Sequence, residues 1–199
     1  MMAKSSFFSL MATLATAAAL SFSCSTTRVL EEGQYRLASN KVEVIGDSKF
    51  NTKKVESYIK QKPNSYIIFG WNPFLNLYNW SGKNPDKAIN RFIRSIGTAP
   101  VVYQPSQVEA SIENINRHLE YLGYYGSDVR SDIEVKGRKV NVTYSITLGK
   151  RFRIGEITYS VPDGEFKDDF LADTSATTVR SGDYLSEDAL EKETERCAS

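Results

Sequence analysis

The feature that most constrains the fold is a pair of alternating segments joined by a short turn. Apolar residues alternate with polar ones from Asp128 to Val135 and again from Val140 to Leu148, with Lys136-Gly137-Arg138 between the two runs. Strict alternation is typical of strands with one buried face, because successive side chains point to opposite sides of a strand. We therefore predict an antiparallel hairpin with one face packed and the other in solvent.

A helix is expected directly before this hairpin. Ser106 and Glu109 have the spacing of a capping box, and Gly123 is placed to end the helix. Apolar residues recur between them at helical spacing, at Val108, Ile112, Ile115, Leu119 and Leu122. This pattern predicts a helix with one apolar face that packs on a core.

The chain before that helix predicts one more strand and one more helix. Residues 41–47 alternate and end in a Gly-Asp turn, which is typical of a strand. A short helix is expected after Asn51 or Thr52, with Val55, Tyr58 and Ile59 on one face. The element order is then strand, helix, helix, strand, strand, which predicts an α+β unit with two helices on one face of a three-stranded sheet.

The first 23 residues are predicted to be a signal peptide. A single early charge, Lys4, is followed by an uncharged apolar run that is shorter than the roughly 20 residues needed to span a bilayer. Small residues before Cys24 resemble the lipobox of bacterial lipoproteins, so Cys24 is expected to carry the acyl chains, palmitate among them, and residues 24–40 to form a polar tether. The alternative is ordinary cleavage near Ala17-Ala18-Ala19, which leaves Cys24 free or paired with Cys197.

An insert of about forty residues, at about 63–104, separates the two helices and is too long for an ordinary loop. Its second half places Ile89, Phe92, Ile93 and Ile96 on one helical face. Its first half is rich in aromatic residues, and we expect membrane or partner contact at Tyr66, Phe69, Trp71, Phe74 and Trp80. The alternative is that the insert forms an extra core layer on its own module.

Composition excludes several classes of function. The 25 basic and 24 acidic residues give a formal net charge of only +1, which does not favour a nucleic-acid partner. One histidine and two cysteines are too few for a closed zinc site, and no catalytic or nucleotide-binding motif occurs. We expect His118 to be a surface residue and Asp168-Asp169 to be a solvated helix start. The chain is therefore predicted not to be an enzyme and to have no cofactor, no metal site and no small-molecule substrate.

Three stretches and the element order resemble the POTRA module. The stretches are Val44-Ile45-Gly46-Asp47, then Leu119-Glu120-Tyr121-Leu122-Gly123-Tyr124-Tyr125, then residues 144–157. The resemblance implies tandem POTRA-like modules of order β-α-α-β-β, one at 41–150 that contains the insert and a second, incomplete one at 151–199. Together with the lipobox, the arrangement is similar to BamA/TamA-type assembly factors in the lipoprotein form of Bacteroidetes, as an N-terminal fragment without their β-barrel.

The resemblance also implies a function and a place for it. It implies a lipid-anchored outer-membrane protein that faces the periplasm and binds unfolded outer-membrane proteins or other envelope proteins by strand addition. The free edge of the sheet is then expected at Val129, Arg130, Ser131, Asp132, Ile133 and Glu134. The alternative is a lipoprotein interaction module that docks to a partner barrel or envelope protein. Under both, Cys24 is the contact with outer-membrane lipid.

Overall fold

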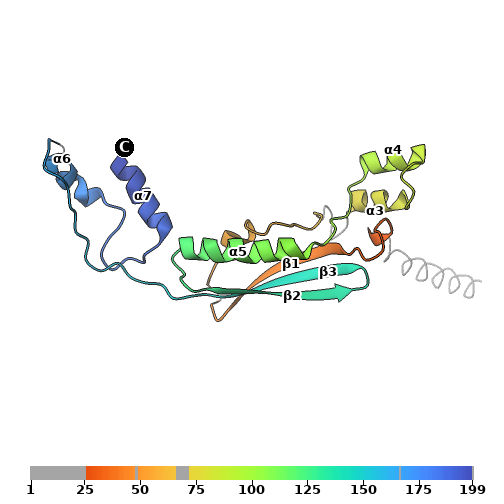
Figure 1. Ribbon diagram of the computed structural model, residues 1–199, viewed down its shortest axis with the longest axis horizontal. Coiled ribbons are helices and arrows are strands. Elements are labelled where there is room, and N and C mark those ends of the chain that lie inside the picture. The colour runs from red at the N-terminus through yellow and green to blue at the C-terminus, as the bar shows by residue number, and fades with distance from the viewer. Residues whose placement is uncertain (1–25, 48, 66–71, 166, 199) are drawn as a thin grey trace, which may run out of the picture. The chain divides into compact units, whose positions relative to one another are not determined.

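A computed structural model of the chain describes residues 26–47, 49–65, 72–165 and 167–198 (Figure 1). The predicted signal peptide and Cys24 lie outside the described residues, as do Tyr66, Phe69 and Trp71. The elements are β1 (Arg36–Ile45), α2 (Lys53–Glu56), α3 (Pro73–Trp80), α4 (Ala88–Ile96), α5 (Pro105–Tyr121), β2 (Asp128–Lys136), β3 (Lys139–Thr147), α6 (Lys167–Ala172), the 3-10 helix η2 (Asp173–Ala176) and α7 (Glu187–Ala198). The predicted α+β class is confirmed.

The strands form one three-stranded sheet of order β1-β3-β2. The Arg36 amide donates to the Arg138 carbonyl at 2.9 Å, and the Ser39 hydroxyl donates to Asn141 Oδ1 at 2.7 Å. These two pairs share the same offset in sequence, so β1 and β3 run parallel. The turn between β2 and β3 contains Gly137 at φ 61°, a conformation that favours glycine. The central strand is β3, and β2 is an edge strand.

The chain forms two compact units. The insert unit comprises Met1–Asn40, Lys62–Gln104 and Ile133–Val142, and the helix unit comprises Lys41–Gln61, Pro105–Asp132 and Thr143–Ser199.

The core of the insert unit forms around α3. Leu30, Leu37 and Leu75 are 2, 1 and 1% exposed, and Asn79 is fully buried. α3 begins with Pro73 after an Asn72 cap, whose side chain accepts from the Leu75 amide at 2.8 Å. These buried leucines are too far apart in sequence for periodicity to have grouped them.

The segment before β1 is held in place rather than forming the predicted tether. Leu30 is buried, and the Arg138 guanidinium donates to the carbonyls of Thr27, Glu31 and Gln34. β1 also begins at Arg36, five residues before the predicted strand. The polar composition of this segment suggested a free tether, because it does not indicate that Arg138 binds the segment's backbone carbonyls.

The helix unit contains α5, whose predicted apolar face is buried. Val108, Ile115 and Leu119 are 5, 0 and 0% exposed. The predicted start was wrong, because α5 begins at Pro105 and Ser106 lies inside its first turn. Proline is favoured at the first helical position, because an amide hydrogen there would have no acceptor within the helix.

The predicted first helix is shorter than its apolar pattern indicated. α2 contains only residues 53–56, although Val55 and Ile59 are both buried. The chain leaves the helix after Ser57, and the Lys60 amide donates to Ser111 Oγ at 3.0 Å. Ile59 therefore reaches the core from outside the helix.

The C-terminal part differs from the predicted start of a second module at one place. Residues 152–159, expected as a strand, form only an isolated bridge between Arg153 and Tyr184. A strand requires a neighbouring strand to pair with, and the described residues supply none beyond this bridge. Ser186 caps α7, because the Ala189 amide donates to Ser186 Oγ at 3.2 Å.

Candidate interaction site

The register of β2 fixes which backbone groups lie on the open edge. A two-residue turn joins Lys136 to Lys139, which makes those two residues a hydrogen-bonded pair. Hydrogen-bonded and non-hydrogen-bonded pairs alternate along an antiparallel ladder. The even-numbered residues of β2 therefore bind β3, and the backbone groups of Val129, Ser131, Ile133 and Val135 point away from it.

The edges of the sheet are covered unequally. Residues 101–103 pair with the chain around the start of β1, because the Leu37 amide donates to the Val101 carbonyl and the Tyr103 amide to the Tyr35 carbonyl, both at 2.8 Å. Among the described residues, no such backbone partner lies along the outer side of β2. β2 is therefore the strand that can accept another one.

The inner face of β2 is only partly packed, which corrects the prediction of one fully packed face. Val129 is 5% exposed, but Ile133 and Val135 are 43 and 53% exposed. The inner residues of β3, by contrast, are all buried, namely Val140, Val142, Tyr144 and Ile146. Alternation predicted the face correctly, but no described residue covers the end of β2 near the turn.

The outer face of β2 carries paired charges. Arg130 contacts Asp128 at 2.7 Å, and Lys136 contacts Glu134 at 2.8 Å, all with exposed side chains. The hydrogen bond from Lys136 holds the pKa of Glu134 below its ordinary value. Charges on an edge strand discourage uncontrolled pairing with other chains. The predicted edge residues thus combine an open backbone with a charged outer face.

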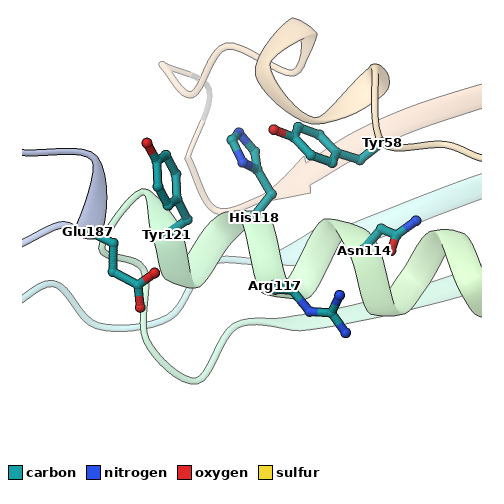
Figure 2. Close-up of a pocket in the computed structure, with 6 residues that line it drawn as sticks. All are labelled: Tyr58, Asn114, Arg117, His118, Tyr121 and Glu187. Carbon is teal, nitrogen blue, oxygen red and sulfur yellow. The ribbon is translucent and has the colours of Figure 1, made fainter. Parts of the chain in front are cut away.

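A pocket of about 340 Å³ in the helix unit was not predicted (Figure 2). His118 stacks on Tyr58 at a centroid distance of 3.9 Å and lies 5.8 Å from the Tyr121 ring, nearly parallel to both. The lining residues are Tyr58, Asn114, Arg117, His118, Tyr121 and Glu187. His118 is half-buried, and its contacts with two tyrosine rings were not predicted.

Hydrogen bonds and burial shift the titration of two of these residues. Burial lowers the pKa of His118, Lys54 lowers it further, and Asp188 partly opposes the shift. Tyr121 donates to Glu191 Oε2 at 2.7 Å, which raises the pKa of the phenol. At neutral pH the pocket therefore presents an uncharged imidazole between two aromatic rings.

One sequence signal could have indicated this pocket. His118 and Tyr121 are three residues apart on a predicted helix, which places their side chains on the same side. Tyr58 lies in the turn after α2, and no local spacing reveals that contact. The described residues contain no group of three or more His, Cys, Asp or Glu side chains arranged to hold a metal ion.

A comparison with protein families decides the identity of this fold. The family model for POTRA, described as surface antigen variable number repeat, matches residues 38–149. The chain belongs to the POTRA family. POTRA domains are non-enzymatic periplasmic scaffolds in outer-membrane protein assembly, so the prediction that the chain is not an enzyme is confirmed. The matched POTRA residues include the whole insert and the β2 edge.

This POTRA chain was also compared with curated proteins and with solved structures. No curated protein matches it. A crystal structure of POTRA domains 3 to 5 of BamA from Haemophilus influenzae aligns with 85% of this chain and 88% of its own, at 11% identity and a TM-score of 0.30. At that TM-score the likeness carries no further argument.

Proposed function

We propose that this POTRA chain is a periplasmic scaffold of outer-membrane protein assembly or translocation, of the BamA/TamA type. It binds unfolded outer-membrane proteins or other envelope proteins by adding their strands to β2. The observation that carries this proposal is the open outer side of β2, opposite its pairing with β3. The proposed contact residues are Val129, Arg130, Ser131, Asp132, Ile133 and Glu134.

The chemistry of this edge suits clients of many sequences. Backbone amides and carbonyls occur in every chain, so an unpaired strand edge binds extended segments without requiring one particular sequence. The exposed Ile133 and Val135 add an apolar surface beside the backbone groups. Arg130 and Glu134 on the other face keep the edge hydrated when no client is bound. The site thus favours transient pairing over permanent aggregation.

The register gives a direct test of strand addition. Ile133→Pro removes an amide that points outward, whereas Asp132→Pro removes an amide that binds β3. With a photo-crosslinker at Arg130, we expect Ile133→Pro to lose crosslinks to unfolded barrel proteins while keeping a cooperative melt. Ile133→Ala, which retains the amide, is the matched control and should keep most crosslinks. Unchanged crosslinking in folded Ile133→Pro would contradict strand addition at β2.

The proposed location depends on Cys24 as the lipid anchor in the outer membrane. Several acyl chains on one residue give stable attachment, since each buried methylene adds about 0.8 kcal/mol. Mass spectrometry of the N-terminal peptide should find acylated Cys24. An unmodified cysteine in the mature protein would exclude this anchor and leave the β2 proposal untouched.

The pocket at His118 favours a second function, docking to one fixed partner barrel or envelope protein. A preformed pocket lined by aromatic rings fits a particular side chain better than a variable client. A photo-crosslinker at Arg117, on the rim of the pocket, should then capture one protein in place of many. Crosslinks spread over many clients would exclude this second function.

A further inference from the structure

Three large apolar residues of α4 face away from the protein, whereas Ile93 is half-buried. Ile89, Phe92 and Ile96 are 61, 61 and 48% exposed, and their spacing places them on one side of the helix. We name these three residues the α4 face. Trp80, at the end of α3, is 64% exposed. Helices of soluble proteins normally turn such a face toward the core.

The opposite side of α4, which carries Arg94, holds the helix against the rest of the insert. Arg94 donates through Nε to Ser81 Oγ at 2.9 Å and through its terminal nitrogen to the Gly82 carbonyl at 2.7 Å. The same guanidinium lies 5.4 Å from the centre of the Tyr78 ring. Figure 1 shows α3 and α4 side by side. The outward direction of the α4 face is therefore fixed by specific bonds.

The charge around the α4 face is basic. Between residues 72 and 104 the chain has four basic residues and one acidic residue, Asp86. Lys83, Lys87 and Arg91 are exposed, and no ion pair joins any of them to another described residue. Exposed aliphatic and aromatic groups with unpaired basic neighbours match the chemistry of an anionic lipid surface.

We infer that the α4 face rests in the interface of a phospholipid bilayer that contains anionic lipid, with Trp80 at headgroup level. None of the described helices has the length and apolar character to cross a bilayer. With nine residues, α4 is much shorter than the roughly 20 residues of a membrane span, and its one-sided apolar pattern suits a contact along the surface. Ile89, Phe92 and Ile96 enter the acyl boundary, and Lys83, Lys87 and Arg91 bind lipid phosphates.

The start of the chain supports the same placement. The Val29 amide donates to Asn79 Oδ1 on α3 at 3.3 Å, and Thr27 is buried in the same unit. Cys24 precedes Thr27 by three residues, which reach at most about 10 Å in any conformation. This step depends on the proposed acylation of Cys24. An acylated chain would then hold the insert unit close to the bilayer.

Vesicle flotation of the mature chain without its lipid, residues 25–199, tests the inference directly. We expect binding to vesicles of phosphatidylethanolamine with phosphatidylglycerol and much weaker binding to phosphatidylcholine alone. The triple variant Ile89→Ser, Phe92→Ser, Ile96→Ser should bind at least about tenfold more weakly. Lys87→Gln with Arg91→Gln should lose about tenfold on the anionic vesicles only.

A matched control separates this surface from general apolar exposure. Ile133→Ser with Val135→Ser removes two other exposed apolar side chains and should leave vesicle binding unchanged. Three results overturn the inference: no vesicle binding by the unaltered chain, equal binding by the triple variant, or a photo-crosslinker at Phe92 that captures a protein while vesicle binding is absent. None of these results bears on crosslinking at β2 or on the mass of the Cys24 peptide, so failure of this inference is distinguishable from failure of the proposed function.

Discussion

Two helices with similar apolar patterns, α5 and α4, differ in whether their apolar face is buried. Val108, Ile115 and Leu119 on α5 are buried, whereas Ile89, Phe92 and Ile96 on α4 are exposed. Helical spacing places three apolar residues on one side of each helix. Periodicity therefore determines which residues share a face, and the neighbours of the helix determine what covers it.

The neighbours of the two helices explain the difference. α5 packs on α2 within a unit whose buried residues include Val55 and Ile146. α4 contacts α3, and its Arg94 binds Ser81 and Gly82, directly after α3, and lies over the Tyr78 ring. An apolar face that meets a core stabilises the fold, while one that faces outward is available to a partner.

The largest expected effect comes from removing the same side chain on each helix. Ile115→Ala removes a fully buried residue and should lower the free energy of unfolding by about 2–5 kcal/mol, through lost burial and a cavity. Ile96→Ala, at 48% exposure, should change it by less than about 0.5 kcal/mol. Denaturant unfolding of both variants measures the difference. Equal losses would show that the two faces are packed alike.

The next largest effect is expected where α4 ends against α3. A Cβ atom at Gly97 would lie 2.7 Å from the Tyr78 amide nitrogen, so Gly97→Ala must push backbone apart. We expect a loss of about 1–3 kcal/mol in thermal or denaturant unfolding. Gly164→Ala is the control, because nothing lies within 4 Å of a Cβ there. A neutral Gly97→Ala would mean that α4 is not held against α3.

A smaller effect is expected at the polar residue in the buried side of α5. Ser111 Oγ accepts from the Lys60 amide at 3.0 Å and donates to the Gln107 carbonyl at 2.5 Å. Ser111→Ala leaves the amide without that acceptor and should cost about 1 kcal/mol of unfolding free energy. Ser95→Ala, on α4 with its hydroxyl exposed, should cost less in the same measurement.

The smallest effect concerns pH and His118 on α5. Burial and Lys54 hold the pKa of His118 below its ordinary value of 6.5. As pH falls below about 6.5, the unfolded chain takes up the proton before the folded chain does, so stability falls until the folded pKa is passed. His118→Gln should flatten this part of the stability curve. An unchanged curve would place the titration at another group.

The sequence predicted most of the helices and strands of the module, but few of the contacts between segments far apart in sequence. The hairpin and the apolar face of α5 follow from local spacing, because neighbouring residues in one element settle them. The packing of Leu30 and the stack of Tyr58 on His118 depend on segments far apart in sequence. Local patterns contain no information on such contacts.

In the candidate site, too, some features could be predicted from the sequence and others could not. The resemblance to the POTRA module implied that β2 is an edge, and the sheet order agrees. The exposure of Ile133 could not be predicted, because alternation alone assumes that a helix covers the whole inner face. Likewise, the predicted apolar face of α4 also included Ile93, which is half-buried while the other three residues are exposed. Which side of α4 is covered depends on what Arg94 binds.

If clients bind to β2 as proposed, the register of the strand determines which client segments can pair with it. The residues whose backbone points outward are the same residues whose side chains share a face with Ile133 and Val135. A strand that pairs with them must itself place every second side chain on that apolar face. The edge would then respond to hydrophobicity of period two, the pattern of a strand in a membrane barrel, and reject a segment patterned as a helix.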